Sequence, residues 1–359
     1  MLPSPSSEPS SGRIIRTLKE GYWDRTEVVE QADGSRRVRK RNKGAHAKGP
    51  WGVESLRREI RYLTTLPPGA AETLPPVLAC WDCTVNGASD IGYETPFYFR
   101  HTDAGELARR GTLSQGEINA FQRDLAEAVL ARIHAPMTPA EPLSRHLTDT
   151  IEHALAGLVA DPALARVIGA PMIALNGQRS VGTREALRRI VEETDALKAL
   201  DAVPSVRLHG DCFLENILWR SAAEPADERR LILLDPVSVA GISCGPPFFD
   251  LVKYESYATG ELLALRSERV ELAGMNSPDH VYHWRIRTED SALAPFQTLN
   301  WHRDFRRAFE ARYGEPDYRL CRLIDGYFSL AMALNTTGLQ QQARLLKGTA
   351  ELNAVLRSS

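Results

Sequence analysis

The chain contains 359 residues, of which 43% are apolar and 25% are charged, with a formal net charge of -2 and a pI near 6.5. A chain of this length and composition can bury a substantial core, and we expect it to form two lobes. Because the net charge is close to zero, electrostatic attraction does not favour nucleic acid or an anionic membrane as the main partner. The five cysteines are scattered and odd in number, which favours free thiols over a disulfide framework.

Residues 1–12 are rich in Ser and Pro and lack both the basic start and the apolar run of a signal peptide. No segment approaches the roughly 20 consecutive apolar residues that span a bilayer. We therefore expect a disordered N-terminal tail, a cytoplasmic location and no membrane contact.

The segment after the tail carries short alternating runs that are typical of strands. Three strands are predicted in sequence, at residues 14–18, 26–31 and 35–40. Asp33-Gly34 is a tight-turn signal between the second and third strands. The first connection, residues 19–25, contains Gly21, and here we expect backbone N–H groups to contact the phosphates of a nucleotide.

A helix is predicted over residues 53–66, because its apolar residues recur at helical spacing and Pro67-Pro68 follows. Strands are predicted next at 76–81 and 95–100, so the first hundred residues indicate a small sheet with one helix. Further along, helical periodicity dominates. The clearest of these later helices are expected near residues 118–133, 187–197, 320–334 and 339–356.

The most informative stretch contains His209-Gly210-Asp211, then Asn216, and then an apolar run that ends at Asp235. Apolar strands flank both aspartates, which predicts a β-hairpin. Such a hairpin would hold Asp211, Asn216 and Asp235 at strand ends, on a rigid support facing one cleft. Metal-assisted phosphoryl transfer requires that arrangement.

This pattern, H-G-D-x-x-x-x-N followed by an apolar strand ending in Asp, resembles the aminoglycoside phosphotransferase and choline kinase superfamily. The segment Gly245 to Val252 is similar to that family's glycine-to-Asp-Leu segment. The resemblance implies an α+β, protein-kinase-like fold of two lobes: a small antiparallel sheet with one helix, and a larger, mainly helical lobe with a catalytic β-hairpin. The implied parts are an N-lobe at 13–102 and a C-lobe at 103–359, with a catalytic loop at 206–250 and a substrate-binding insert at 266–303.

Carried onto this sequence, the resemblance implies that Asp211 orients the acceptor hydroxyl and takes its proton, while Asn216 and Asp235 hold Mg²⁺. The implied cofactors are Mg²⁺ and ATP or GTP. The chemistry supports this set, because the transferring group spreads negative charge over its oxygens and hard oxygen ligands suit Mg²⁺.

The family also implies a strand lysine that holds the α- and β-phosphates and a helix glutamate that pairs with it. Lys40 is our choice, since Val38 and Lys40 share one face of their strand. Glu59 lies beside the apolar stripe of its helix, whereas Glu54 lies nearer the helix start, where it would serve the helix dipole. The alternative for this cation-rich strand is a solvated basic edge.

Two further residues are expected to support the catalytic loop: His209 as a packed or hydrogen-bonded anchor, and Asp250 through hydrogen bonds to the backbone. The sequence also departs from the family pattern. The phosphate-contacting loop is poor in glycine, and Asp235 is followed by Pro236. Only 14 residues separate Asp235 from Asp250, which is too short for a regulated activation segment and argues against a protein substrate.

The acceptor is expected to bind the helical lobe, where the insert is rich in rings and cations. Its candidate contacts are Tyr282, Trp284, Arg285 and Trp301; the alternative is a surface hairpin packed on its own aromatics. From Leu251 onward there are 13 Asp and Glu against 14 Lys and Arg. This balance favours a sugar, nucleoside or amino alcohol over a polycation.

Three alternatives remain open at this point. The first is a kinase that inactivates aminoglycoside-type antibiotics. The second, from another class, is a nucleotide-binding pseudokinase that acts as a scaffold. The third is a protein kinase, which the short segment after Asp235 disfavours.

Overall fold

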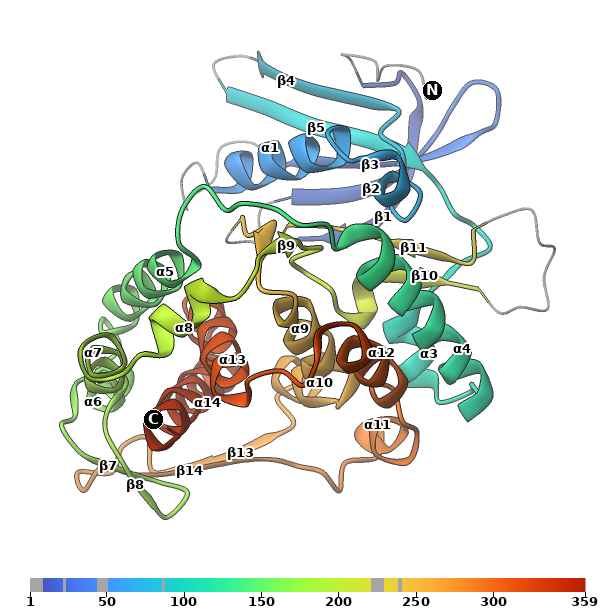
Figure 1. The fold of residues 1–359 in the computed structure, drawn as a ribbon. Coiled ribbons are helices and arrows are strands. Elements are labelled where there is room, and N and C mark those ends of the chain that lie inside the picture. The colour runs from blue at the N-terminus through green and yellow to red at the C-terminus, as the bar shows by residue number, and fades with distance from the viewer. Residues whose placement is uncertain are drawn as a thin grey trace. The chain divides into compact units, whose positions relative to one another are not determined.

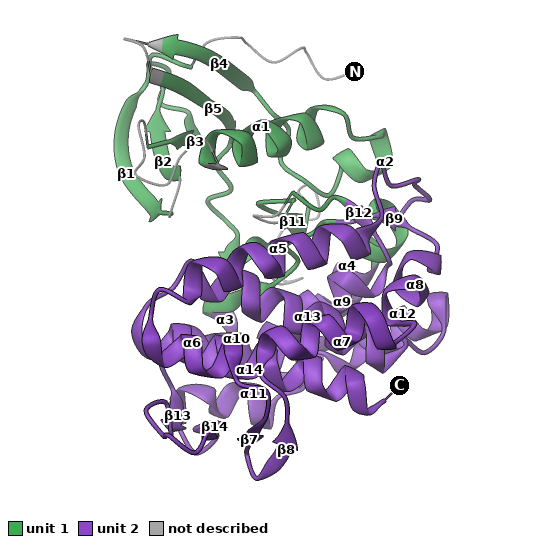
Figure 2. Ribbon diagram, turned by 90° about the vertical axis from the view of Figure 1, so that its left-hand side faces the viewer, with its two compact units in different colours: residues 1–106, 127–133, 209–243 green, residues 107–126, 134–208, 244–359 purple. Residues whose placement is uncertain are grey.

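The computed structural model describes residues 9–21, 24–43, 51–85, 88–220, 229–237 and 241–358. The chain divides into two units (Figure 2). Unit 1 comprises residues 1–106, 127–133 and 209–243, and unit 2 comprises residues 107–126, 134–208 and 244–359. Unit 1 therefore contains both the N-terminal sheet and the segment of the predicted catalytic hairpin.

The main sheet of unit 1 has five antiparallel strands in the order β1-β2-β3-β5-β4 (Figure 1). Its strands are β1 (Arg13–Glu20), β2 (Asp24–Glu30), β3 (Arg36–Asn42), β4 (Ala79–Val85) and β5 (Ala88–Pro96). The first three strands lie close to where the sequence predicted them. The strand predicted at 95–100 is wrong, because β5 ends at Pro96.

The polar residues of β5 explain why its sequence did not indicate a strand. Ile91 and Tyr93 are buried on one face, but Gly92 separates them and Glu94 follows. Glu94 is fully buried in this strand because its carboxylate accepts hydrogen bonds from Arg39 Nε (2.8 Å) and Ser10 Oγ (2.8 Å). Ser10 belongs to the segment that the sequence assigned to the tail.

Helix α1 (Trp51–Thr64) packs on β3 and β5, as the apolar spacing predicted. Its buried residues include Leu56, Glu59 and Leu63. Unit 1 also contains a small three-stranded sheet in the order β11-β10-β6. Its remaining elements are α2 (Pro68–Ala71), β6 (Thr102–Asp103), the π-helix η1 (Glu127–Ile133), the 3-10 turn η2 (Leu214–Asn216), β10 (Ile217–Trp219) and β11 (Leu231–Leu233).

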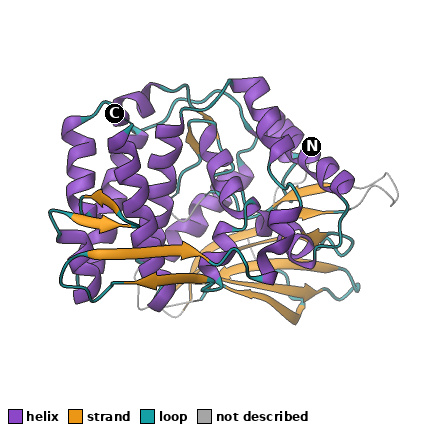
Figure 3. Cartoon of the chain, turned by 90° about the horizontal axis from the view of Figure 1, so that it is seen from below, coloured by secondary structure: helices purple, strands orange, loops and turns teal. Residues whose placement is uncertain are grey.

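Unit 2 is mainly helical, which confirms the predicted change of composition along the chain (Figure 3). Helix α3 (Ala104–Arg110) crosses the boundary between the units. The other helices are α4 (Gln115–Ala126), α5 (Leu143–Leu158), α6 (Pro162–Gly169), α7 (Thr183–Glu193), α8 (Ala196–Ala202), α9 (Phe248–Ala258), α10 (Glu261–Arg266), η3 (Ser291–Leu293), α11 (Ala294–Thr298), α12 (Arg303–Tyr313), α13 (Tyr318–Ala333) and α14 (Gly338–Arg357).

Two small sheets accompany these helices. One joins β9 (Val206–Arg207) to β12 (Cys244–Gly245). The other has the order β13-β14-β7-β8, and its strands β13 and β14 contact α14. The strands of this second sheet are β7 (Ile173–Leu175), β8 (Gln178–Ser180), β13 (Val270–Ala273) and β14 (Val281–Ile286). Within the described part of the chain, no helix has the length and apolar character needed to cross a bilayer.

Candidate active site

The predicted hairpin is present and brings its polar ends together. Strand β10 pairs antiparallel with β11, with Ile217 opposite Leu233. The N–H of Leu234 then donates to the carbonyl oxygen of Asn216 at 2.7 Å. Asn216 immediately precedes β10 and Asp235 follows β11 by two residues, so both lie at the same end of the hairpin.

Asn216 is tied to Asp211 across the loop that joins them. Its Nδ2 donates to the Asp211 carboxylate oxygen Oδ2 at 2.9 Å and to the Asp211 backbone oxygen at 3.0 Å. Because the amide nitrogen faces Asp211, the amide oxygen Oδ1 points away from it. Because Asp211 and Asn216 lie five positions apart on one short loop, these hydrogen bonds hold a carboxylate and an amide group in a fixed arrangement.

His209, which was predicted to support the catalytic loop, lies at the start of the same loop. The side chain is fully buried, and its Nδ1 accepts from the N–H of Asp211 at 3.3 Å. Its backbone oxygen accepts from the N–H of Val237 at 2.6 Å. Gly210 between His209 and Asp211 has a φ of 82°, a conformation that glycine adopts without strain.

Lys40 lies at the centre of the second cluster. Its Nζ donates to both carboxylate oxygens of Glu59, at 3.0 and 2.9 Å, and to Oδ1 of Asp235 at 3.0 Å. The Lys40 and Glu59 side chains are only 8% and 6% exposed, whereas that of Asp235 is 28% exposed. Strand β3, helix α1 and the turn after β11 thus supply three charged groups to one point.

Two residues of this cluster were not among those predicted from the sequence. Lys19 Nζ lies 3.5 Å from Oδ2 of Asp235, and the hydroxyl of Tyr93 donates to Oε1 of Glu59 at 2.7 Å. Tyr93 was missed because its strand was misplaced. Lys19 sits on a strand whose side chains are all exposed, and only the fold reveals its proximity to Asp235.

Burial and the nearby lysine charges shift the pKa values of Glu59 and Asp235 in opposite directions. Burial raises the pKa of Glu59 to about 7, although the nearby Lys40 charge opposes this. Burial also favours the neutral form of Asp235, but the charges of Lys40 and Lys19 outweigh it and lower the pKa of Asp235 below its ordinary value. Burial disfavours the charge on Lys40, yet Asp235 and Glu59 prevail and raise its pKa well above the ordinary value.

The structure distinguishes Lys40 and Glu59 from the alternatives that the sequence offered. Glu54 is exposed and pairs with Arg58 at 3.2 Å on its own helix. Arg39, next to Lys40, points to the opposite face of the sheet, where it binds Glu94. The basic strand is therefore a row of paired cations, with Lys40 the one directed at Asp235.

Gly21 lies at the end of β1, in the loop predicted to contact nucleotide phosphates. Its carbonyl oxygen accepts from Lys43 Nζ at 2.6 Å. A Cβ atom here would lie 2.4 Å from Oδ1 of Asp24, so a larger residue would require the Asp24 side chain to shift. The next two residues of the loop, 22 and 23, lie outside the described residues.

Asp250 is fully buried on α9 in unit 2. Its Oδ2 lies 3.1 Å from Nε2 of His134, and Nδ1 of His134 lies 3.1 Å from the hydroxyl of Tyr313. His134, which the sequence analysis did not select, is thus the partner that holds this carboxylate within unit 2.

The four candidate acceptor residues have different surroundings in unit 2. Tyr282 is fully buried on β14, and Trp301 is 1% exposed and packs edge-to-face on Phe121 with ring centroids 5.8 Å apart. Trp284 is half-buried, and exposed Arg285 pairs with Glu271 at 2.7 Å. Tyr282 and Trp301 therefore lie in the interior of unit 2 and contribute to its packing.

The residues of unit 1 fit a magnesium-bound nucleotide by their chemistry. Asp235 offers a carboxylate and Asn216 an amide oxygen, and Lys40 and Lys19 supply positive charge beside them. Among the residues that the structure describes, no three His, Cys, Asp or Glu side chains form a metal-binding group. Mg²⁺ suits such a sparse protein donor set, because it is commonly bound by one or two carboxylates together with substrate phosphates and water.

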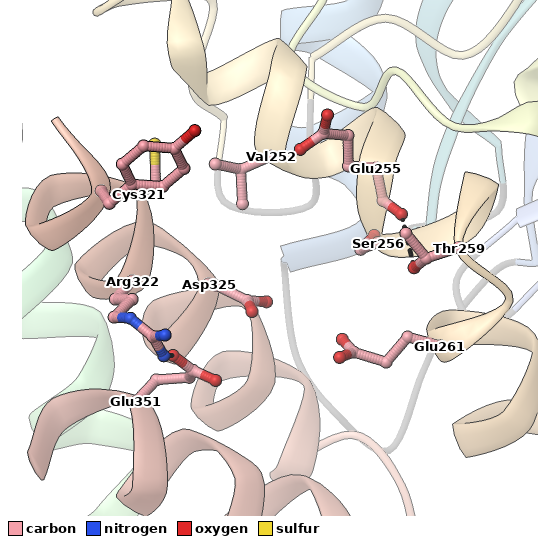
Figure 4. Close-up of a pocket in the computed structure, with 10 residues that line it drawn as sticks. Val252, Glu255, Ser256, Thr259, Glu261, Cys321, Arg322, Asp325 and Glu351 are labelled. Atoms are coloured by element: carbon pink, nitrogen blue, oxygen red, sulfur yellow. Dashed lines mark hydrogen bonds and ion pairs between the residues drawn. The ribbon is translucent and has the colours of Figure 1, made fainter. Parts of the chain in front are cut away.

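A separate cavity of about 230 Å³ lies among the helices of unit 2 (Figure 4). Carboxylates from several helices line it, namely Glu255, Glu261, Asp325 and Glu351. Next to it, the buried ammonium of Lys347 on α14 lies 3.0 Å from Glu261 and 3.8 Å from Glu351, and also bonds to Asp325. Arg322 pairs with Glu351 at 2.9 Å, and Arg306 pairs with Glu255.

Comparison with known proteins assigns residues 14–254 to the model of a family described as "Phosphotransferase enzyme family". Among solved structures, a putative fructosamine-3-kinase from Thermobifida fusca YX-ER1 is 15% identical with a TM-score of 0.52, covering 97% of this chain and 96% of that one. This similarity confirms the predicted fold class.

Two further solved structures resemble the chain more distantly. An aminoglycoside phosphotransferase from Streptomyces rimosus ATCC10970, in complex with ADP and streptomycin, is 20% identical with a TM-score of 0.47, over 87% of this chain and 91% of that one. A glucosamine kinase is 14% identical with a TM-score of 0.43, over 99% and 96%. No curated protein matches the sequence.

The Lys40–Glu59 pair generates a prediction about stability. Lys40→Met should lower the free energy of unfolding by about 3–5 kcal/mol, because it leaves Glu59 buried without its cation. Adding Glu59→Gln should recover part of this loss, giving a coupling energy above about 1 kcal/mol in a double-mutant cycle measured by urea unfolding. The control cycle is the exposed pair Arg145 and Asp149, where coupling should stay below about 0.5 kcal/mol. Equal coupling in the two cycles would contradict a buried pair.

The cavity cluster generates a prediction about pH. Burial raises the pKa of Glu261 to about 7, with Lys347 opposing and Asp325 and Glu351 reinforcing the shift. The folded state therefore holds a proton that the unfolded state releases, so stability from this group is full below about pH 4.5 and is lost as the pH rises through 7.

Glu261→Gln removes this titration, so its stability relative to the native chain should increase between pH 5 and pH 8. The measurement is the unfolding midpoint in urea across that range. Glu152→Gln, an exposed change on α5, is the control and should leave the pH profile as it is. A Glu261→Gln variant whose relative stability falls with rising pH would show that the pKa of Glu261 is not raised.

Proposed function

Because the chain belongs to the phosphotransferase enzyme family, we propose that it transfers the γ-phosphoryl group of ATP or GTP, bound with Mg²⁺, to a hydroxyl group of a small molecule. The observation that carries this proposal is the convergence of Lys40, Glu59 and Asp235 in the same unit as the Asp211–Asn216 pair. A cationic phosphate contact, a metal ligand and an acid–base group are the parts that phosphoryl transfer needs.

Each residue has a role that follows from its position. Lys40, oriented by Glu59, would bind phosphate oxygens through its ammonium, while Asp235 and the Oδ1 of Asn216 would hold the metal ion. The metal ion, when bound, neutralises charge on the phosphate oxygens. Lys19 adds a second positive charge on the outer side of Asp235.

Asp211 would act on the acceptor. Its carboxylate accepts the proton of the attacking hydroxyl as the new oxygen–phosphorus bond forms and the bond from the γ-phosphorus to the bridging oxygen breaks, releasing the nucleoside diphosphate. The hydrogen bond from Asn216 Nδ2 fixes one carboxylate oxygen of Asp211 and so helps to orient the carboxylate toward the hydroxyl. No covalent intermediate on the protein is needed.

The acceptor class that we propose is a neutral or weakly charged hydroxyl metabolite, such as a sugar, nucleoside or amino alcohol. The support is the near-equal number of acidic and basic residues from Leu251 onward. The carboxylates around the unit 2 cavity do not change this balance, because Lys347, Arg322 and Arg306 are paired with them.

Substitutions of the two aspartates should separate chemistry from nucleotide binding. Asp211→Asn should reduce turnover by about 100-fold or more while nucleotide affinity changes little, because only the proton acceptor is lost. Asp235→Asn should weaken Mg²⁺–nucleotide binding as well as turnover. Calorimetry with ATP and Mg²⁺ and a phosphoryl-transfer assay measure the two effects.

Asp149→Asn, an exposed change on α5, is the matched control and should behave as the native chain. Unchanged turnover in Asp211→Asn would remove the proposed base, and unchanged metal–nucleotide affinity in Asp235→Asn would overturn the placement of the ion. Tight nucleotide binding without transfer to any acceptor would instead support a scaffold.

A mass-spectrometric acceptor screen tests the substrate class. From a panel of sugars, nucleosides and amino alcohols we expect phosphorylated products that are heavier than the acceptor by roughly 80 Da, the mass of one added HPO₃ group. Cationic aminoglycosides should be turned over less well. The short segment after Asp235 predicts no labelling of polypeptides. Turnover of aminoglycosides far above that of the other acceptors would reverse the ordering, and labelled polypeptides would indicate a protein kinase.

A further inference from the structure

The turn that follows β11 contains two residues in the left-handed region of backbone space. Asp235 has a φ of 51° and Val237 a φ of 66°. Aspartate tolerates this region, because its short polar side chain can bond locally. Valine does not: its branched Cβ collides with the adjacent backbone, and a β-branched residue at positive φ is a rare outlier.

Hydrogen bonds on both sides hold this turn in place. Before Asp235, the N–H of Leu234 donates to the Asn216 oxygen at 2.7 Å; after it, the N–H of Val237 donates to the His209 oxygen at 2.6 Å. His209 and Asn216 are the two ends of the loop that carries Asp211. Asp235 is therefore fastened at both flanks to the segment that contains Asp211 and Asn216.

The residues between these two bonds leave the turn little freedom. Pro236 is buried, and its ring fixes φ near -65°. Val237 has few allowed conformations, and the one it adopts is maintained by the bond to His209. The resulting turn directs the Asp235 carboxylate toward Lys40 and Lys19.

We propose that Val237 is a positioning residue: its strained left-handed backbone, held by His209, fixes the direction in which Asp235 presents its carboxylate to a metal-bound nucleotide. This inference rests on the proposed function for the role of Asp235. Glycine would adopt the same φ without strain, so a chain selected for stability alone would favour glycine here. Strain of this kind is retained where a fixed geometry is useful.

The test compares Val237→Gly with Val237→Ala, since both remove the same side-chain contacts and differ in backbone freedom. At an ordinary negative φ, glycine is less stable than alanine. At Val237 we expect the reverse, with the thermal midpoint of the glycine variant higher by about 2–4 °C. The matched control is Val191, a half-exposed valine on helix α7, where the glycine variant should melt below the alanine variant.

The second readout is the affinity for ATP with Mg²⁺, measured by calorimetry without an acceptor. The glycine variant should bind about tenfold more weakly than the alanine variant, because glycine, which lacks Cβ, frees the backbone of the turn and no longer fixes Asp235. If Val237 served only the stability of the fold, the more stable glycine variant would bind nucleotide at least as well as the alanine variant. Weaker binding by the more stable variant therefore indicates a positioning role.

The outcomes separate the inference from the proposed function. If glycine is less stable than alanine at both valines, Val237 is not strained and the inference is overturned. If glycine is more stable at Val237 but the two variants bind nucleotide equally, the positioning role is overturned. A native chain that binds no nucleotide under these conditions would overturn the proposed function, and the positioning role with it, whatever the order of the melting temperatures.

Discussion

The arrangement of unit 1 depends on the ion pairs that the buried ammonium of Lys40 forms with Glu59 and Asp235. Removing a charge from water is expensive unless partners surround it, and here two carboxylates lie within 3.0 Å of Nζ. The partners come from α1 and from the turn after β11, more than 170 residues apart in the sequence. The pairing therefore joins the five-stranded sheet, its helix and the β10–β11 hairpin through one nitrogen atom.

The same ammonium gives its two partners different protonation behaviour. Glu59 is the more deeply buried, and the neighbouring negative charge of Asp235 adds to burial in raising its pKa. Asp235 is partly exposed and lies near a second lysine, so positive charge dominates and lowers its pKa. An ionised Asp235 is what a metal ligand requires, and Lys40, one of the two cations that keep it ionised, is also the residue proposed to bind phosphate. One arrangement therefore serves both demands.

Local patterns predicted the parts of this site that local geometry determines. Asp211 and Asn216 were selected by the H-G-D-x-x-x-x-N pattern, in which four residues separate them on one loop, and Lys40 because strand alternation places it on one face with Val38. Glu59 followed from its position beside the apolar stripe of α1.

Tyr93 and Lys19 could not be predicted, since their contacts depend on strand pairing and on residues far along the chain. Likewise, nothing in Asp235-Pro236-Val237 indicates that valine takes a left-handed conformation; that follows from the hydrogen bond to His209. Tyr282 and Trp301 were selected by residue type, but Tyr282 lies where β14 pairs with the distant strand β7, and Trp301 packs on Phe121 of α4.

A shifted pKa alone does not identify a functional site in this chain, because buried carboxylates in both units show one. Lys347 in unit 2 faces three carboxylates from α10, α13 and α14, and the pKa of Glu261 there reaches about 7, as does that of Glu59. In unit 2 the ammonium of Lys347 attracts carboxylates from three helices and so holds these helices together. In unit 1 the cluster is combined with features that helix packing does not require: a carboxylate and an amide oxygen at the end of a hairpin, a second cation beside Asp235, and a turn held against the preference of its own valine. These added features, rather than the shifted pKa values, distinguish the proposed phosphoryl-transfer site in unit 1 from the buried ion cluster in unit 2.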